Sequence, residues 1–290
     1  NAYVQPLASR YFSGLESNLR QLGVNSSLHI MLSNGGVVTA ETASAVPVRL
    51  VESGPAAGAL IAGYYGVQLG ERHVLAFDMG GTTAKLCLVD DGHPMITYTF
   101  EVARVHRFKR GSGLPLRIPS VELVEIGAGG GSIAYIDELG LLSVGPQSAS
   151  AHPGPACYGF GGKDPTVTDA DLLLGYLNPH YFLGGRIQLD VDAAREAVES
   201  RLARKLGLDV TQIAWGIHDV VNENMASAAS VYIAEKGRDY RRYTLVATGG
   251  AGPVHAVGVA RKIGLRSVIV PPAAGVASAT GLLVAPPRMD

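Results

Sequence analysis

Apolar and polar positions along the chain predict strands that alternate with helices. Residues 2–22 carry apolar side chains at steps of three and four, the spacing of an amphipathic helix, whereas residues 73–79 form a short apolar run typical of a buried strand. The expected strands are residues 28–32, 73–79, 85–91, 94–104, 243–248 and 267–271, with 46–53 extended and broken at Gly54-Pro55. The expected helices are residues 2–22, 39–45, 56–65, 168–177, 191–206, 211–236, 254–263 and 275–285. This interleaving predicts an α/β domain.

Two segments modify this picture. Residues 101–165 are rich in glycine and proline with only short strands, so we expect an irregular β insert there. The helix at 211–236 is expected to form around its apolar residues, which are Trp215, Val220, Met225 and Val231.

Glycine is the unusual feature of the composition. The chain has 37 glycines among 290 residues, which is roughly 13% against a usual share of about 7%. They occur in clusters without a repeat. Clustered glycine in a chain that is 47% hydrophobic indicates tight turns or a backbone that approaches a ligand closely.

Charge and cysteine content narrow the class of protein. The formal net charge is −1, and no basic run is present that would hold nucleic acid phosphates or a membrane surface. No apolar run reaches about 18 residues, so no membrane span is expected. The two cysteines, Cys87 and Cys157, are too few for a disulfide scaffold and favour a reduced, cytoplasmic protein.

The segment FDMGGTTAK (77–85) bends a predicted β-hairpin. Gly80 and Gly81 would let backbone N–H groups turn toward one anion, and Thr82 and Thr83 add hydroxyl donors. Asp78 beside phosphate makes sense if it holds Mg²⁺ through water or orients an attacking water. A plain tight hairpin fits the same residues. A Walker motif is absent, and that motif would precede a helix.

A second glycine-rich segment, TGGAGPVHA (248–256), joins a predicted strand to a helix. Gly249, Gly250 and Gly252 would let a flat ring or a ribose lie against the backbone, beside the N–H groups of the helix start. Ordinary close packing of strand and helix explains the same glycines. His255 near that helix start is more often structural than catalytic.

Three further segments carry candidate residues. The run GAGGGS (127–132) has more consecutive glycines than turn geometry needs, but Ser132 has no neighbouring base. The proline-stiffened loop at 152–159 presents His152 and Cys157, which are too few ligands for zinc; a packed thiol is favoured over a nucleophile. Residues 164–171 indicate a capped helix start, with Asp169 and Asp171 at its positive end.

Together these motifs resemble a known family. D-x-G-G-T-T in a hairpin, followed by a strand–GGAG–helix junction, is similar to the phosphate and adenosine motifs of the actin, Hsp70 and sugar kinase superfamily. The wider amino-acid sequence resembles the hydantoinase A/5-oxoprolinase family along essentially the whole chain. The segments that carry this resemblance are SNGGVVTAETA (33–43), ESGPAAGA (52–59), FDMGGTTAK (77–85), GAGGGSIAYID (127–137), VGPQSASAHPGPACYG (144–159), PTVTDADLLLG (165–175), GGAGPVHA (249–256) and VPPAAGVASATGLL (270–283).

The resemblance implies an activity. It implies an actin-like, ribonuclease H-like fold and ATP-dependent hydrolysis of a cyclic amide such as a hydantoin, an N-methylhydantoin or 5-oxoproline, by phosphorylation of the amide oxygen. ATP and Mg²⁺ would be bound by the residues already singled out, with Asp78 as the catalytic and metal-side residue. The alternatives are the ATP-using subunit of an acetone or acetophenone carboxylase and a non-catalytic nucleotide-binding module. A hydantoinase B-type subunit or domain is the implied partner.

The resemblance also exposes a gap and a departure. The chain begins at Asn1, and it lacks the additional G-x-D-x-G-G-T motif that family members carry near the N-terminus. We therefore expect an internal fragment of a longer chain, with the end of the first lobe at 1–70 and the second lobe at 71–290. The isolated fragment should be weakly active or inactive. Lys85 stands where many members have an acid; it either faces the cleft or is a solvated strand residue.

Overall fold

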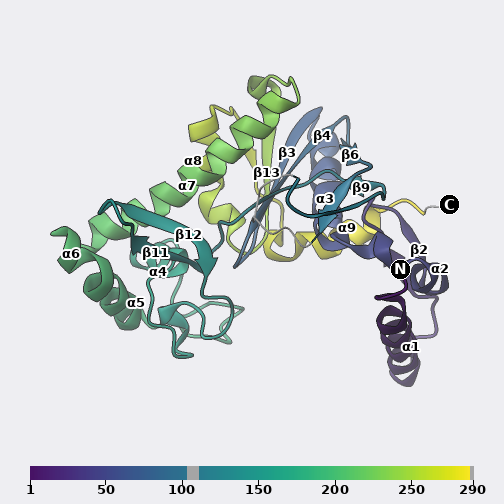
Figure 1. The fold of residues 1–290 in the computed structure, drawn as a ribbon, viewed down its shortest axis with the longest axis horizontal. Helices are drawn as coiled ribbons and strands as arrows, with labels where there is room; N and C mark the ends of the chain where they lie inside the picture. The colour runs from purple at the N-terminus through teal and green to yellow at the C-terminus, as the bar shows by residue number, and fades with distance from the viewer. Residues whose placement is uncertain (103–110, 288–290) are drawn as a thin grey trace. The chain divides into compact units, whose positions relative to one another are not determined.

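The computed structural model describes residues 1–102 and 111–287. It has a mixed α/β fold that divides into two compact units (Figure 1). The first unit contains Asn1–Ala76, Cys87–Leu123 and Val276–Asp290, and the second contains Phe77–Leu86 and Val124–Gly275. The predicted phosphate hairpin, glycine run and strand–GGAG–helix junction all belong to the second unit.

A six-stranded sheet carries the hairpin. Its order is β10 (Val124–Ile126), β4 (Ala84–Asp90), β3 (His73–Met79), β13 (Thr244–Thr248) and β14 (Val268–Ile269), with β5 (His93–Pro94) also paired to β4. β10 runs antiparallel to β4, and β13 runs parallel to β14. The sheet interior is apolar, since Phe77, Leu86 and Leu245 are fully buried. β3 and β4 therefore present the turn between them from a rigid support.

The first unit contains helices and short strand pairs. Its helices are α1 (Gln5–Gln21), α2 (Ala40–Ala45), η1 (Pro47–Leu50), α3 (Ser53–Gln68) and α9 (Ala277–Val284). Its strand pairs are β1 (His29–Met31) with β2 (Val37–Thr39), β6 (Ile96–Thr97) with β9 (Ser120–Val121), and β7 (Phe100–Val102) with β8 (Leu114–Leu116). α3 and α9 pack closely, and the absence of a Cβ on Gly281 permits this, since a Cβ there would collide with the carbonyl oxygen of Ala57.

The second unit contains helices of very different lengths. They are α4 (Val167–Leu173), α5 (Val191–Val198), the π-helical turn η3 (Glu199–Ala203), α6 (Arg204–Leu206), α7 (Val210–Glu235) and α8 (Gly252–Ile263). α7 packs on both α4 and α8, and α8 packs on β13 (Figure 1). The antiparallel pair β11 (Ser132–Ile136) and β12 (Leu142–Ser148), the short turn η2 (Ala156–Tyr158), η4 (Tyr240–Arg242) and η5 (Ala274–Val276) complete it.

Most predicted elements are confirmed, and several details are wrong. Residues 47–50 form the 3₁₀ turn η1 in place of an extended segment, because Pro47 is favoured at a helix start. Gly54-Pro55 does not break the chain; both residues lie inside the first turn of α3. The third strand is divided into β5, β6 and β7, and its last predicted residues, 103–104, lie outside the described residues.

Another error concerns the buried face of α7. The expected residues Trp215 and Val231 are 53% and 59% exposed, whereas Ile217 and Val221 are fully buried. The sequence pattern does not identify the buried face of α7, because this helix is apolar nearly all round and small residues widen its buried stripe. On α1, similarly, Phe12 is buried while Leu7 and Tyr11 stay exposed.

Across the described ranges, no helix combines the length and apolar character needed to cross a membrane. The lobe boundary near residue 70 stays a prediction, because lobes are defined on the family's complete chain whereas compact units reflect contacts within this one.

Candidate functional site

The candidate site begins at the tight turn between β3 and β4. The backbone N–H of Gly80 donates to the carbonyl oxygen of Thr83 over 3.1 Å and closes the hairpin. The N–H groups of Gly81, Thr82 and Thr83 donate to no acceptor within residues 1–102 and 111–287. Neighbouring backbone N–H groups that lack partners can bind an anion together. The turn thus offers donors to a ligand.

The fold of the turn does not require its two glycines. Neither Gly80 nor Gly81 has φ in the left-handed region, and a Cβ added to either meets no described atom within 4 Å. Gly81 and Thr82 are also exposed. Glycine that the fold does not need leaves room for a ligand to approach the backbone.

Asp78 is the partly buried acid of the turn, at the end of β3. Burial raises the pKa of its carboxyl group, and the positive charge of Lys85 opposes that rise. Glu125 of β10 lies directly opposite Lys85 in the sheet, so these two side chains share a face. Lys85 also lies close enough to Asp78 for their charges to interact. A buried acid with a perturbed pKa is a common feature of functional sites.

The loop after β13 lies against the end of β3. The N–H of Ala251 donates to the carbonyl oxygen of Met79 over 3.0 Å. Gly249 has a φ of +83°, and a Cβ there would collide with the Met79 carbonyl oxygen and the Asp78 carboxylate. Only glycine combines this backbone conformation with so close an approach. Gly249 is therefore required by the fold.

Gly250 and Gly252 occupy different positions in that loop. Gly250 is exposed, and its N–H finds no acceptor in the described part of the chain. Gly252 is the buried first residue of α8, a helix without a side-chain cap. Pro253 has no N–H and the N–H of Val254 donates to the carbonyl oxygen of Ala251 over 3.2 Å, so among the described residues the N–H groups of Gly250 and Gly252 are the ones left without an acceptor at the start of α8.

The glycine run at 127–132 supports both motifs. Gly130 N–H donates to the Gly80 carbonyl oxygen over 3.0 Å, and Gly131 N–H donates to that of Gly81 over 2.6 Å. A Cβ on Gly129 would lie 2.6 Å from the backbone of Thr82. Close approach to the hairpin, rather than turn geometry, thus explains the consecutive glycines.

The β3–β4 hairpin and the loop before α8 both lie close to Gly130. A Cβ at this position would lie 4.0 Å from Cα of Gly81 and 3.9 Å from Cβ of Ala251. The phosphate and adenosine motifs expected from the sequence are therefore neighbours within the second unit. Ser132 is buried, and its Oγ accepts from Gly129 N–H over 2.9 Å, which is a structural role.

The loop at 152–159 offers no reactive thiol. Cys157 is fully buried, and burial together with the nearby Asp169 carboxylate raises the pKa of its thiol. A thiol that stays protonated is a poor nucleophile and a poor metal ligand. His152 is exposed and its ring lies 5.2 Å from that of Phe160. Asp169 accepts from the backbone N–H groups of Thr166 and Cys157, which confirms the predicted helix cap.

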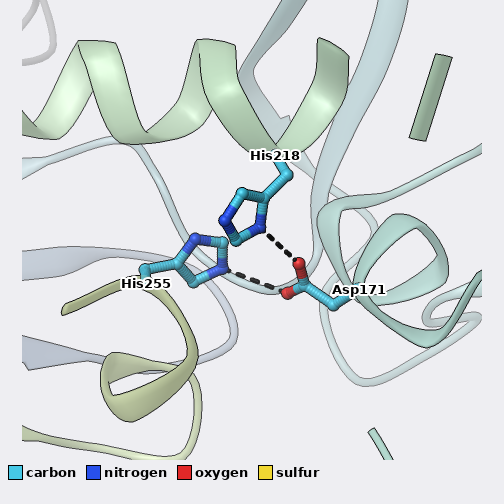
Figure 2. Close-up of side chains that lie close together, drawn as sticks. All are labelled: Asp171, His218 and His255. Carbon is cyan, nitrogen blue, oxygen red and sulfur yellow. Dashed lines mark hydrogen bonds and ion pairs between the residues drawn. The ribbon is translucent and has the colours of Figure 1, made fainter. Parts of the chain in front are cut away.

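A buried cluster that sequence reasoning did not assemble joins side chains of α4, α7 and α8 (Figure 2). Asp171 of α4 accepts from Nδ1 of His218 over 2.8 Å and from Nε2 of His255 over 3.1 Å. The other ring nitrogen of His255 lies 2.8 Å from Oδ1 of Asn222. The imidazoles stack with centroids 4.7 Å apart. Burial alone raises the pKa of Asp171, but the hydrogen bonds and charges of both histidines outweigh it and lower that pKa.

These three side chains are also a candidate metal set. Their ligand atoms all lie within 4.8 Å of one another. Tetrahedral zinc would require them to converge on one centre at about 2.0–2.2 Å. The two ring nitrogens instead face different oxygens of Asp171, each at hydrogen-bond distance (Figure 2). The geometry therefore favours a shared carboxylate over a chelate.

One sequence signal could have pointed to the cluster. His218 and Asn222 are four residues apart on α7, beside the buried Val221 and Met225. Polar side chains four apart on a buried helical face need partners, because burying them unpaired is unfavourable. That pattern indicates a buried polar network, although it does not identify Asp171 or His255.

Comparison with known proteins matches the whole chain. The model of the hydantoinase/oxoprolinase family matches residues 1–290. The chain belongs to this family. Its members that resemble the chain include an uncharacterised protein of Methanocaldococcus jannaschii, 43% identical over all of this chain and 43% of that protein.

A caprolactamase resembles the chain both in sequence and in structure. The caprolactamase subunit alpha of Pseudomonas jessenii is 36% identical over all of this chain and 40% of its own length. The crystal structure of that ATP-dependent caprolactamase aligns with a TM-score of 0.81, at 35% identity, over 98% of this chain and 40% of that one.

The nucleotide-free structure of an acetone carboxylase aligns equally well, with a TM-score of 0.82 and 29% identity, over 95% of this chain and 37% of its own. The chain thus spans about two fifths of the curated relatives.

Gly249 provides a test of the close backbone approach. Gly249→Ala should lower the free energy of unfolding by about 2–4 kcal/mol, because alanine is strained at this φ and its Cβ overlaps Met79 and Asp78. Gly250→Ala is the matched control, since a Cβ there meets no described atom within 4 Å. Urea unfolding of the three proteins measures the difference. Equal stability of the two variants would contradict the described loop.

Proposed function

We propose that the second unit binds the phosphates of ATP at the β3–β4 turn and the nucleoside at the start of α8. The observation that carries this proposal is the turn itself. It has three backbone N–H groups without a protein acceptor in the described ranges, and two glycines that the fold does not need. Both features fit a phosphate cradle and neither is needed by a plain hairpin. The family match supports the same conclusion.

The proposed residue roles follow the geometry. Gly80, Gly81, Thr82 and Thr83 surround the phosphates, and Asp78 holds Mg²⁺ through water or orients the attacking water. Gly249, Gly250 and Gly252 bring the backbone of the second loop against the ribose or base. The neighbouring positions of Gly81 and Ala251 around Gly130 support a single ligand that reaches from one motif to the other.

The proposed reaction is ATP-dependent opening of a cyclic amide. The γ-phosphoryl group passes from ATP to the amide oxygen and ADP leaves; one water then adds to the activated carbon and the ring C–N bond breaks, which leaves an acyl phosphate, and a second water hydrolyses this to the carboxylate and free phosphate. Hydantoins, N-methylhydantoins, 5-oxoproline and larger lactams are the substrate class. The family description and the caprolactamase relative support this class. Backbone donors and a metal-side carboxylate suit phosphoryl transfer, which depends on positioning and charge stabilisation.

The rival function is the ATP-using subunit of a ketone carboxylase, which the acetone carboxylase structure supports. Both reactions phosphorylate an oxygen, of the amide in one and of the ketone enolate in the other. The site described above serves either, so the substrate decides between them. A non-catalytic nucleotide-binding module is a weaker rival.

The remaining proposals concern the whole protein. We propose an actin-like, two-lobed ATPase architecture, supported by the D-x-G-G-T-T hairpin and the GGAG junction, in which a first lobe completes the nucleotide site. We also propose a hydantoinase B-type partner, in line with relatives that are named as subunits. A cytoplasmic location is supported by two buried free thiols.

Gly81→Ala tests the cradle against the plain turn. Because its Cβ has room, this variant should keep the wild-type stability while Mg·ATP affinity falls by about tenfold or more, roughly 1.4 kcal/mol. Calorimetric titration and thermal unfolding of the intact protein measure both. Gly14→Ala on α1, where a Cβ also has room, is the control that should bind nucleotide normally. Unchanged affinity for Gly81→Ala would support the plain turn.

Asp78→Asn should separate activity from stability. Because burial raises the pKa of Asp78, the folded state holds its proton more tightly than the unfolded chain does. Stability from this group therefore falls as pH rises from about 3.9 to the raised pKa, and the ionised form is unfavourable at neutral pH. We expect ATP turnover to fall about 10²-fold or more. The melting temperature at pH 7 should stay unchanged or rise.

The matched control is Asp91→Asn. Asp91 is an exposed acid after β4 that pairs with Arg72, and asparagine tolerates its positive φ. Its turnover should match the wild type. A strongly destabilised Asp78→Asn protein with normal turnover would show that Asp78 is structural.

A coupled ATPase assay of the intact protein with its partner decides the substrate class. ADP release should depend on a hydantoin, 5-oxoproline or caprolactam, and not on acetone or acetophenone with bicarbonate. Ketone-dependent ADP release would establish the rival function, and nucleotide binding without turnover would favour the non-catalytic module. Residues 1–290 alone should hydrolyse ATP weakly or not at all.

A further inference from the structure

A continuous set of hydrogen bonds joins the glycine run to the buried cluster. The N–H and the hydroxyl of Thr168, at the start of α4, both donate to the carbonyl oxygen of Gly130, over 2.7 and 2.8 Å. Gly130 in turn donates to Gly80 of the phosphate hairpin. The position of α4 is thus coupled directly to the proposed cradle.

Asp171 carries this connection from α4 to α8. It lies three residues after Thr168, on the same short helix, and accepts from His255 over 3.1 Å. His255 lies three residues after Gly252, in the first turn of the helix that starts at the proposed nucleoside loop. The loop itself returns to the hairpin through the Ala251 N–H and the Met79 carbonyl oxygen. The contacts therefore form a closed ring that includes both loops of the proposed nucleotide site.

Burial makes the bond between Asp171 and His255 hard to replace. Asp171 is 3% exposed and His255 is 0% exposed, so water offers neither of them a substitute partner. Removing one member of a buried hydrogen-bonded pair leaves the polar group of the other unsatisfied, which is unfavourable. α7 reinforces the pair, because Asn222 faces the second ring nitrogen of His255.

His218 has a different position in the cluster. It donates to the second oxygen of Asp171, but its helix, α7, carries none of the three glycine segments. Its ring stacks on Trp215, which is 53% exposed. His218 therefore supports the carboxylate without belonging to the ring of contacts.

We propose that Asp171 is a positioning residue that keeps the phosphate hairpin and the nucleoside loop in their relative positions. It does so through Thr168 and Gly130 on one side and through His255 on the other. It touches no substrate; it acts by fixing the distance between two ligand-binding backbones. This inference rests on the proposed nucleotide site, but its structural part can be measured without nucleotide.

The test uses Asp171→Asn in the intact protein, with Leu172→Ala as the matched control. Leu172 is buried on the same helix but packs against Cys157, Leu189 and Ala194 instead of α8. At equal global stability, adjusted with urea, amide hydrogen exchange without nucleotide should be about tenfold faster at 127–132 and 249–256 in Asp171→Asn only. Mg·ATP affinity should fall about tenfold in the same variant. His218→Phe should change both quantities less than Asp171→Asn does.

Two measurements on the wild type remain informative if Asp171→Asn does not fold. In ¹⁵N-histidine-labelled protein, slowly exchanging ring N–H signals from His218 Nδ1 and His255 Nε2 are expected, and their absence would overturn the proposal. A stoichiometric metal ion bound by Asp171, His218 and His255 would also overturn it, by replacing the hydrogen bonds with a chelate.

The outcomes separate the two proposals. Equal exchange in Asp171→Asn and Leu172→Ala would refute the positioning role whatever the ligand is. Faster exchange in the two loops, combined with a wild type that binds no nucleotide, would support the positioning role and refute the proposed nucleotide site.

Discussion

The second unit depends on three backbone segments that lie closer together than side chains permit. The glycine run at 127–132 and the loop at 248–252 each form main-chain hydrogen bonds with the hairpin at 77–85, and glycines at the contacts let the backbones approach closely. A Cβ at Gly129 or Gly249 would overlap the neighbouring backbone. Because the segments come from distant parts of the chain, the sheet and the helices behind them must set their distances within a few tenths of an ångström.

This constraint divides the glycines into two groups. Gly129, Gly131 and Gly249 are held against protein backbone and are explained by packing, whereas Gly80, Gly81 and Gly250 have open space where a Cβ would be. The second group is the one next to unpaired N–H groups. Glycine content alone therefore does not identify a ligand site; what the missing Cβ would touch does. Asp78 lies between the two groups, in contact range of Gly249, with a pKa raised by the same close packing.

Local sequence patterns predicted the strands β3, β4 and β13 and the turn between β3 and β4, because each depends on neighbouring residues. The same reasoning left a hairpin and a phosphate cradle equally open, since the partners of the turn are far away in the chain. Asp171 lies 47 residues from His218 and 84 from His255, so no local pattern brings them together. The buried face of α7 was chosen wrongly, because its apolar residues extend around the helix.

A structure of the intact protein with its partner, a non-hydrolysable ATP analogue and Mg²⁺ tests the proposed site most directly. We expect phosphate oxygens within hydrogen-bond distance of the N–H groups of Gly81, Thr82 and Thr83, Asp78 on the metal side, and the ribose or base against Gly249–Gly252. Phosphates bound elsewhere, with the β3–β4 turn left in solvent, would contradict it.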